Sequence, residues 1–292
     1  MKTKCFFLII VIVLASCSGK NHKSDAYGNF ETDDVIISSE ANGKLLFFDV
    51  DEGEKVEADK LVGIIDTTDL ILRKKQLFAQ KKAISSRLEN IQSQIDVQEQ
   101  QKKNLLVDKK RIENLLKDGA ATQKQLDDIN GKLDLIEVQI SSIKTQNTTV
   151  LTELEVANTQ IDQIGESIRK CNIINPINGV VLEKYAEPNE ITAFGKPLYK
   201  IANLNDMYLR VYVSGAQLPH IKIGEQVEVL IDENEKTNKK LTGKVCWISE
   251  TAEFTPKIIQ TKEERVNLVY AVKIKVKNDG SLKIGMPGEA NF

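Results

Sequence analysis

Aromatic residues and histidines are scarce in this chain. Phe, Trp and Tyr make up 5% of the 292 residues, and the only histidines are His22 and His220. So few aromatic side chains argue against a large aromatic core. Two histidines far apart in the sequence do not supply a catalytic triad or a zinc site. The scarcity of histidine therefore argues against the common hydrolytic and metal-dependent enzymes.

An excess of one charge sign and a phosphate-binding loop are also missing. The net charge is −2, with no block of basic residues, so we expect no nucleic-acid partner. The pattern Gly-xxxx-Gly-Lys-Ser/Thr does not occur, so any ATP hydrolysis belongs to a partner. Carboxylate pairs such as Asp127-Asp128 and Glu263-Glu264 are interpreted as solvated charges. The sequence therefore predicts a protein that is not an enzyme and that holds no cofactor and no metal.

The apolar run at the N-terminus is too short to span a membrane. Lys2 and Lys4 precede apolar residues from Phe6 to Leu14, and small residues follow. A spanning helix needs roughly 20 apolar residues. A basic start, a short apolar run and small residues are typical of an export signal. We therefore expect the mature protein outside the cytoplasm.

The end of this signal resembles a bacterial lipobox. It reads Leu14-Ala15-Ser16-Cys17, and the resemblance implies cleavage before Cys17 and attachment of diacylglycerol to its thiol. Residues 1–16 would then be a lipoprotein signal peptide. The alternative is an ordinary signal peptide with a chance cysteine. Residues 17–34 are polar without an apolar period and are predicted to form a flexible tether.

Only two of the four cysteines, Cys171 and Cys246, remain as thiols in the mature chain. Their separation fits neither a metal site nor a redox pair. We expect two buried, inert thiols, with a disulfide between them as the alternative.

Proline is absent from residues 68–171, and glycine occurs there only at positions 119, 131 and 165. This composition is typical of long helices. From Leu126 to Ile168 apolar residues recur at alternating spacings of three and four, with Asn147 as the polar exception, which indicates a coiled-coil seam. The seam of the first half is looser. Its members are Leu70, Leu77, Ile84, Leu88, Ile91, Ile95, Leu105, Ile112 and Leu115.

The break between the two seams predicts a hairpin. Gly119 can end the first helix in the left-handed conformation. Thr122 can cap the second helix, with Gln125 completing a capping box. Two antiparallel arms, each roughly 70 Å long at 1.5 Å per residue, would bury both seams. Residues 68–171 are thus predicted to form an α-helical hairpin with its tip near residues 117–122.

Strand-and-turn patterns flank the hairpin. Residues 35–67 and 172–204 contain short β-branched clusters and tight-turn signals, and each half is too small to hold a core alone. They are predicted to close on one another as a split β-domain. Residues 205–292 alternate in period two and are predicted to form a small antiparallel β-barrel. The predicted fold class is α+β.

The two halves of the split domain resemble a biotinyl-lipoyl-like module. EANGKLLFFDVDEGEKVEADKLVGIID is similar to its first half, and INPINGVVLEKYAEPNEITAFGKPLYKIANL to its second. A lipoyl or biotinyl carrier needs a lysine at the turn between the halves. The sequence there is Asp66-Thr67-Thr68-Asp69, so a carrier function is not predicted.

The order of the parts resembles the periplasmic adaptors of tripartite exporters, the haemolysin D or membrane-fusion-protein family. The run from Phe254 through Glu264-Arg265 to Leu268-Val269-Tyr270 resembles the barrel signature of adaptors that serve ABC-type exporters. The resemblance implies a lipid-anchored periplasmic adaptor, held at the inner membrane. It would link an ABC permease and ATPase to a TolC-like outer-membrane duct, for efflux or secretion.

The same resemblance implies that several copies, commonly six, assemble into a tube. Two alternatives stay open. An adaptor could serve an RND-type or MFS-type transporter instead. A structural coiled-coil envelope lipoprotein would explain the helices, but not the split module or the barrel signature.

The resemblance also assigns candidate docking residues at the hairpin tip. Adaptors of TolC-type ducts carry an arginine, a leucine four residues on and a serine seven beyond that. Here these positions are Arg111, Leu115 and Thr122, with threonine keeping the hydroxyl and adding a methyl. A guanidinium and a hydroxyl can pair with carbonyls of a partner, and a leucine can anchor it. The alternatives are a solvated Arg111, a seam position for Leu115 and a capping role for Thr122, which is compatible with docking.

Overall fold

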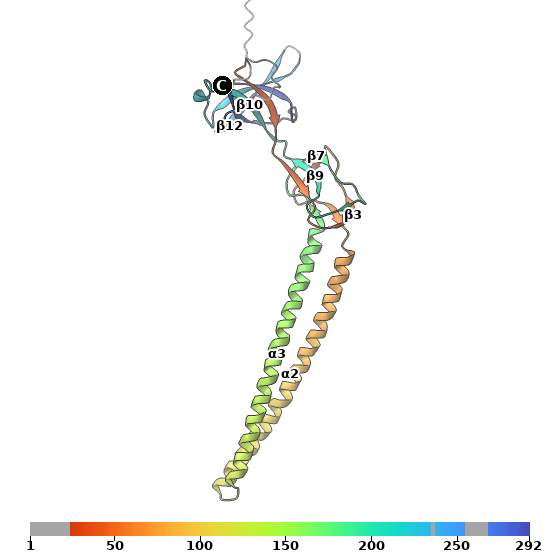
Figure 1. Cartoon of the computed structure of the whole chain (residues 1–292), viewed down its shortest axis with the longest axis vertical. Coiled ribbons are helices and arrows are strands. Elements are labelled where there is room, and N and C mark those ends of the chain that lie inside the picture. The colour runs from red at the N-terminus through yellow and green to blue at the C-terminus, as the bar shows by residue number, and fades with distance from the viewer. Residues whose placement is uncertain (1–23, 235–236, 255–267) are drawn as a thin grey trace, which may run out of the picture.

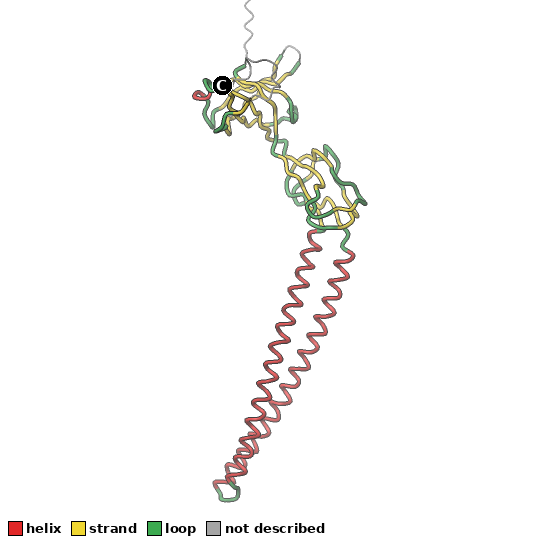
Figure 2. The backbone as a smooth tube through the Cα atoms, viewed as in Figure 1, coloured by secondary structure: helices red, strands yellow, loops and turns green. Residues whose placement is uncertain are grey.

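The computed structural model describes residues 24–234, 237–254 and 268–292. Figure 1 shows three parts in succession along the long axis: a β-barrel, a smaller β-domain and a long helical hairpin. Figure 2 shows that helix is concentrated in the hairpin and strand in the other two parts. The predicted α+β fold class is confirmed.

The hairpin consists of α2 (Thr68–Lys117) and α3 (Gln123–Lys170). At 1.5 Å per residue each arm is roughly 70–75 Å long. The predicted seam of α3 faces α2. Its buried members are Ile129, Leu133, Ile136, Ile140, Val150, Ala157 and Ile161.

The α2 side of the interface is more polar. Only Ile91 and Ile95 are buried in α2. Lys74, Lys81, Gln98, Lys102 and Lys109 are half-buried at the seam positions between its apolar residues. Lysine can occupy such positions because its aliphatic stem packs while its ammonium reaches water. The polar patch in the first seam is thus part of the interface.

The prediction that Leu115 belongs to the seam is wrong. Leu115 is 41% exposed, whereas Leu116 is half-buried. Leu116 follows Ile112 by four residues and Lys109 by seven, which keeps it on the side that faces α3. The interpretation of Leu115 as a seam residue is therefore corrected, and its side chain is available at the surface.

The smaller β-domain contains two four-stranded sheets, and each combines strands from before and after the hairpin. The first sheet has the order β2 (Asp34–Ser38), β9 (Pro197–Ala202), β7 (Gly179–Lys184), β4 (Lys55–Val56). The second has the order β6 (Asn172–Ile174), β5 (Leu61–Ile65), β3 (Gly43–Phe48), β8 (Ile191–Thr192). Their shared core includes Leu45, Val62, Ile65, Val181, Leu198 and Ile201. The two halves close on one another, as the split lipoyl-like module requires.

The barrel closes through six antiparallel strands. Their order is β10 (Asp206–Ser214), β1 (Ala26–Glu31), β15 (Pro287–Asn291), β11 (Gln226–Asp232), β12 (Asn238–Ile248) and β14 (Leu268–Lys277), which pairs with β10. The two-residue strand β13 (Glu253–Phe254) lies at the edge of β14, and the 3-10 helix η1 (Leu218–His220) follows β10. The interior is aliphatic, with Leu209, Val229 and Ile274 fully buried.

The prediction that residues 17–34 form a flexible tether is wrong for the second half of this segment. Residues 26–31 form β1, which pairs with both β10 and β15. Ala26 and Phe30 are buried in the barrel. Two buried side chains four residues apart are too weak a pattern to predict a strand, and the strand is stabilised by partners far along the chain.

The two thiols are free and differ in exposure. Cys171 is buried and Cys246 is exposed, so the predicted pair of buried thiols is wrong for Cys246, and the alternative disulfide is not formed. The register of β12 against β14 shifts between Val245 and Trp247. Cys246 occupies this bulge and follows the buried Val245, so strand alternation turns its side chain outward.

Candidate functional site at the hairpin tip

The end of α2 is a Schellman turn. Gly119 has a φ of +73°, in the left-handed region that glycine adopts at little cost. The Ala120 N–H donates to the Leu115 carbonyl at 2.8 Å, and the Gly119 N–H donates to the Leu116 carbonyl at 3.1 Å. These two bonds satisfy carbonyls that the end of a helix leaves without partners. The predicted role of Gly119 is confirmed.

The start of α3 is a capping box. The Gln125 N–H donates to Thr122 Oγ1 at 3.4 Å, and the Thr122 N–H donates to Gln125 Oε1 at 2.8 Å. The predicted cap is confirmed. Both caps are local, so the tip is an ordered turn whose exposed side chains are held on fixed backbone.

Arg111 and Leu115 lie on the last two turns of α2. Four residues separate them, which places them on one face of the helix. The Arg111 side chain is 70% exposed, and among the described residues it forms an ion pair with Asp108, at 3.2 Å. Together with the exposed Thr122, these residues present a guanidinium, an apolar side chain and a capping hydroxyl near the tip.

Sequence reasoning did not identify Asp108 as the partner of Arg111. The signal was present, because an acidic residue three positions before an arginine in a helix commonly pairs with it. A surface pair of this kind contributes about 0–1 kcal/mol. It therefore leaves the guanidinium free to exchange partners.

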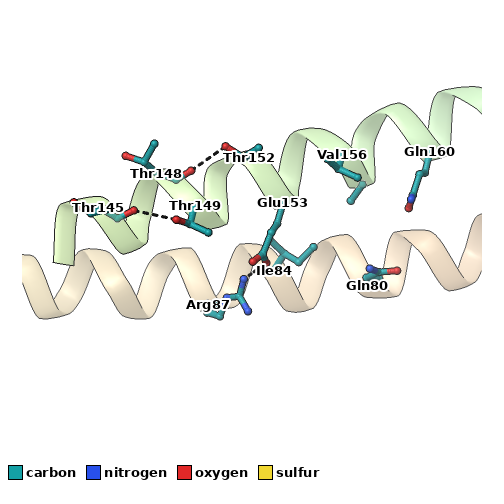
Figure 3. A pocket seen from close by; sticks show the side chains of 11 residues that line it. Gln80, Ile84, Arg87, Thr145, Thr148, Thr149, Thr152, Glu153, Val156 and Gln160 are labelled. Carbon is teal, nitrogen blue, oxygen red and sulfur yellow. Dashed lines mark hydrogen bonds and ion pairs between the residues drawn. The ribbon is translucent and has the colours of Figure 1, made fainter. Parts of the chain in front are cut away.

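A shallow groove of about 840 Å³ lies between the arms of the hairpin. Figure 3 shows an ion pair between Arg87 and Glu153 crossing it. The hydroxyls of Thr149 and Thr152 donate to the carbonyls one turn earlier, those of Thr145 and Thr148. The lining contains no cysteine, histidine or unpaired carboxylate, so the groove offers no nucleophile and no general base.

The described residues contain no metal-binding cluster. No group of three or more His, Cys, Asp or Glu side chains is close enough there to hold an ion. Burial raises the pKa of the Cys171 thiol, which makes that side chain a poor nucleophile. Within the same ranges, no helix combines the length and apolar composition that crossing a bilayer requires.

Several predicted features lie outside the described residues. They are the signal peptide, the lipidated Cys17, His22 and most of the barrel signature, including Glu264-Arg265. Of that signature, the structure describes Phe254 in β13 and Leu268, Val269 and Tyr270 on β14.

Comparison with known sequences gives distant relatives that align over nearly their whole length. No family model matches the chain. A UPF0194 membrane protein of Yersinia enterocolitica is 23% identical over 325 residues, which cover 100% of this chain and 98% of the relative. A UPF0194 membrane protein of Acidithiobacillus ferridurans is 24% identical over 327 residues, which cover 98% and 94%.

Solved structures share the architecture. MacA from Actinobacillus actinomycetemcomitans aligns with a TM-score of 0.60 and 20% identity, over 91% of this chain and 76% of that one. A membrane fusion protein from Streptococcus pneumoniae aligns with a TM-score of 0.51 and 16% identity, over 91% and 96%. The likeness extends over barrel, lipoyl-like domain and hairpin together. The chain therefore has the fold of a membrane fusion protein.

Proposed function

We propose that the protein is a periplasmic adaptor of an efflux or secretion system, which links an inner-membrane transporter to an outer-membrane channel. The observation that carries this proposal is the hairpin itself. Two arms of 50 and 48 residues end in a capped turn that exposes Arg111, Leu115 and Thr122. The arms enclose no catalytic pocket. Their length and exposed side chains are suited to contact with a partner that lies far from the barrel.

The two ends of the molecule suit two different partners. The barrel and the hairpin tip lie at opposite ends of the long axis (Figure 1). Cys17 precedes β1 by nine residues, which limits its distance from the barrel to roughly 30 Å. A diacylglycerol on Cys17 would hold the barrel at the inner membrane and leave the tip pointing across the periplasm.

The class of the transporter and the residues that dock on the channel are assigned from the resemblance in the sequence. Phe254 to Tyr270 supports an ABC-type transporter, with RND-type and MFS-type transporters as alternatives. Arg111, Leu115 and Thr122 would dock on a TolC-like duct. Copurification of the tagged protein with an ABC permease from solubilised membranes would support the first assignment, and copurification with an RND or MFS transporter would remove it.

A photo-crosslinker at position 115 in living cells tests the adaptor proposal. We expect it to trap an outer-membrane channel, identified by mass spectrometry. A matched crosslinker at the exposed position Leu151, near the middle of α3, should not trap the channel. If position 115 traps only further copies of the chain, the structural lipoprotein alternative replaces the adaptor.

Charge reversal separates docking from folding. Arg111→Asp should abolish the channel crosslink without changing the far-UV circular dichroism, because the side chain is exposed. Arg73→Asp, at the exposed base of α2, is the control and should leave the crosslink intact. A normal crosslink from the Arg111 variant would remove this residue from the docking site.

Fractionation tests the lipid anchor. Cys17→Ala should move the processed protein from the membrane fraction to the soluble fraction, because one thioether-linked lipid is its predicted attachment. Cys246→Ala should stay with the membranes. Retention of the Cys17 variant after signal cleavage would show that the anchor is elsewhere.

A further inference from the structure

A groove of about 560 Å³ lies on the outer wall of the barrel, across β12 and β14. Its charged lining residues are three lysines and one aspartate, namely Lys244, Lys275, Lys277 and Asp206. Its other lining side chains are uncharged, and they include Ile223, Gln226, Thr242 and Cys246. The groove therefore has an excess of two positive charges.

Two of the three lysines have no ionic partner in the described part of the chain. Lys275 forms an ion pair with Asp206 at 3.0 Å. Neither Lys244 nor Lys277 forms an ion pair within residues 24–234, 237–254 and 268–292. Lys244 of β12 lies directly opposite Lys275 of β14, and like charges at opposite positions of a sheet repel one another. An anion held between the two strands would relieve this repulsion.

The nearest other carboxylates already have partners. Glu228 of β11 accepts from Lys240 Nζ at 2.8 Å. The Glu225 carboxylate accepts from the backbone N–H of Lys222 at 3.1 Å. Neither of them can neutralise the two unpaired lysines without giving up its own contact.

An exposed isoleucine lies at the rim of the groove. Ile223 is 67% exposed, and the turn that presents it is fixed to β12. The Gly224 N–H donates to the Val245 carbonyl at 2.8 Å, and the Val245 N–H donates to the Glu225 carbonyl at 2.9 Å. Gly224 has a φ of +94°, which glycine adopts at little cost. The backbone thus holds a large apolar side chain in water beside the lysines.

The loop that carries Ile223 also contacts the N-terminal end of the barrel. Gln217 Nε2 donates to the Asp25 carbonyl at 2.8 Å, and Asp25 Oδ2 accepts from the Phe292 N–H at 3.0 Å. The chain therefore enters the barrel beside this loop. Cys17 precedes Asp25 by eight residues, which limits their distance to roughly 28 Å. A lipid on Cys17 would keep the loop and the groove near the membrane surface.

The residue types match those found where proteins contact a lipid surface. Lysine binds phosphate through its ammonium group, and each lysine near an anionic membrane strengthens binding roughly fivefold. An exposed apolar side chain can enter the boundary between headgroups and acyl chains. Trp247, the only tryptophan of the chain, is 40% exposed and follows Cys246 of the groove. Tryptophan is enriched at the same boundary.

We propose that this groove binds the phosphate group of an anionic phospholipid in the membrane, with Lys244 and Lys277 on the phosphate and Ile223 in the lipid surface. The membrane is the expected source of the phosphate, because Ile223 would gain nothing from a free ion. This inference rests on the proposed function for the membrane that the groove faces. The site would orient the barrel rather than anchor it, since two lysines contribute far less than the acyl chains of a lipid.

Cosedimentation with vesicles tests the site on the mature chain. The protein begins at residue 17 and carries Cys17→Ala, so neither the signal peptide nor a lipid contributes. At low salt it should bind vesicles of phosphatidylglycerol mixed with phosphatidylcholine, and not vesicles of phosphatidylcholine alone. Lys244→Gln combined with Lys277→Gln should weaken the binding about 25-fold, at roughly fivefold for each lysine.

The matched control removes two exposed lysines outside the groove. Lys55→Gln combined with Lys283→Gln makes the same charge change and should bind as the parent chain does. Equal binding to both kinds of vesicle, or equal losses in the two double variants, would overturn the proposal.

Cys246 reports whether the groove is occupied. In this mature chain the other thiol, Cys171, is buried, so a soluble maleimide labels Cys246. Vesicles that contain phosphatidylglycerol should slow this labelling, and they should not slow it in the Lys244, Lys277 variant. Labelling of the parent chain that such vesicles leave unchanged would overturn the proposal.

Inorganic phosphate and Ile223 distinguish the two sources of a phosphate group. Ile223→Ser should weaken the binding to phosphatidylglycerol vesicles while circular dichroism stays native. Inorganic phosphate at constant ionic strength should protect Cys246 less than the vesicles do. Equal protection by both, together with unchanged vesicle binding of the Ile223 variant, would make free phosphate the ligand and overturn the membrane source.

Failure of the lipid site and failure of the proposed function give different results. Vesicle binding without channel capture from position 115 would keep the lipid site and remove the adaptor function. Channel capture without vesicle binding would do the reverse.

Discussion

At the scale of single residues, Asn175 joins the two halves of the lipoyl-like domain. It is fully buried. Its Nδ2 donates to the carbonyls of Glu57, from the first half, and Ile177, from the second, at 2.7 and 2.6 Å. Its Oδ1 accepts from the Tyr199 hydroxyl at 3.0 Å. Burial raises the pKa of Tyr199, so that hydroxyl stays protonated and remains a donor.

Asn175→Ala should therefore destabilise the domain strongly. The change leaves two carbonyls and one hydroxyl without partners, and each unsatisfied buried group costs about 1–3 kcal/mol. We expect a loss of about 3 kcal/mol in the free energy of unfolding, measured by urea denaturation. Tyr199→Phe removes one bond and should cost about 1 kcal/mol. Equal losses for both variants would contradict the central role of the asparagine.

The two thiols should label at different rates. Burial raises the pKa of both Cys171 and Cys246, so little thiolate exists near neutral pH and labelling should accelerate as the pH rises. Cys246 is exposed and should react with maleimide in the folded protein, whereas Cys171 should not. Mass spectrometry of digested protein checks this, with denatured protein as the control in which both react. Rapid labelling of Cys171 in the native state would contradict its burial.

At the scale of elements, the hairpin combines well-formed ends with an uneven interface. The turn between the arms is stabilised by hydrogen bonds between residues at most five apart. The seam between the arms is apolar on α3 and partly polar on α2. Stability of the turn and stability of the arms can thus be changed separately.

Gly119→Ala should destabilise the turn by about 1–2 kcal/mol, because an alanine in the left-handed region is strained. The added Cβ would meet no atom within 4 Å, so the cost comes from the backbone alone. Thr122→Ala should cost about 1 kcal/mol through the lost cap, and Thr122→Ser almost nothing. Urea denaturation followed by far-UV circular dichroism measures all three. An unchanged Gly119 variant would show that the turn tolerates another conformation.

Gln98→Leu should stabilise the arms. Gln98 occupies a seam position of α2, three residues after Ile95, and its buried Oε1 has no hydrogen-bond partner. A leucine removes that unsatisfied oxygen and adds apolar contact with α3, for a gain of about 1 kcal/mol. The control Gln94→Leu changes an exposed residue and should be neutral. A loss of stability at position 98 would indicate that the glutamine is needed there.

At the scale of the whole molecule, a two-stranded ribbon runs through both β-domains. β1 continues into β2 through Thr32 and Asp33, and β9 continues into β10 through residues 203–205. β1 pairs with β10 in the barrel, and β2 pairs with β9 in the lipoyl-like domain. The Thr32 hydroxyl donates to the Asn203 carbonyl at 3.2 Å between the two. The chain therefore joins the barrel to the lipoyl-like domain through paired strands.

The reach of the hairpin can be tested by shortening both arms equally. Deletion of residues 84–97 and 143–156 removes two heptads from each arm at the same level, which preserves the seam register and shortens the hairpin by roughly 21 Å. We expect a folded protein that no longer captures the outer-membrane channel from position 115. Deletion of residues 84–97 alone should instead destabilise the hairpin, because the register is lost. Channel capture by the shortened protein would contradict the spanning role.

The sequence by itself determined the hairpin, its turn and the exposed tip. These features depend on interactions between residues a few positions apart: the periodicity of the seam, the turn at Gly119 and the Thr122–Gln125 capping box. Such local patterns can be recognised in the sequence before the fold is known. The ion pair of Asp108 with Arg111 could have been predicted for the same reason, because the two residues are three positions apart in one helix. The general architecture of the β-domains followed from the alternation of their strands.

Only the tertiary structure decided the features that depend on distant partners. β1 is a barrel strand because Tyr27 pairs with Tyr212, and such pairing leaves little local signal. Leu115 points outward because Leu116 fills the seam, a choice set by packing against α3. Trp247 is exposed next to the exposed Cys246 because the bulge of β12 against β14 interrupts the alternation of the strand. In each case the deciding interaction comes from a segment distant in the sequence, which local patterns do not encode.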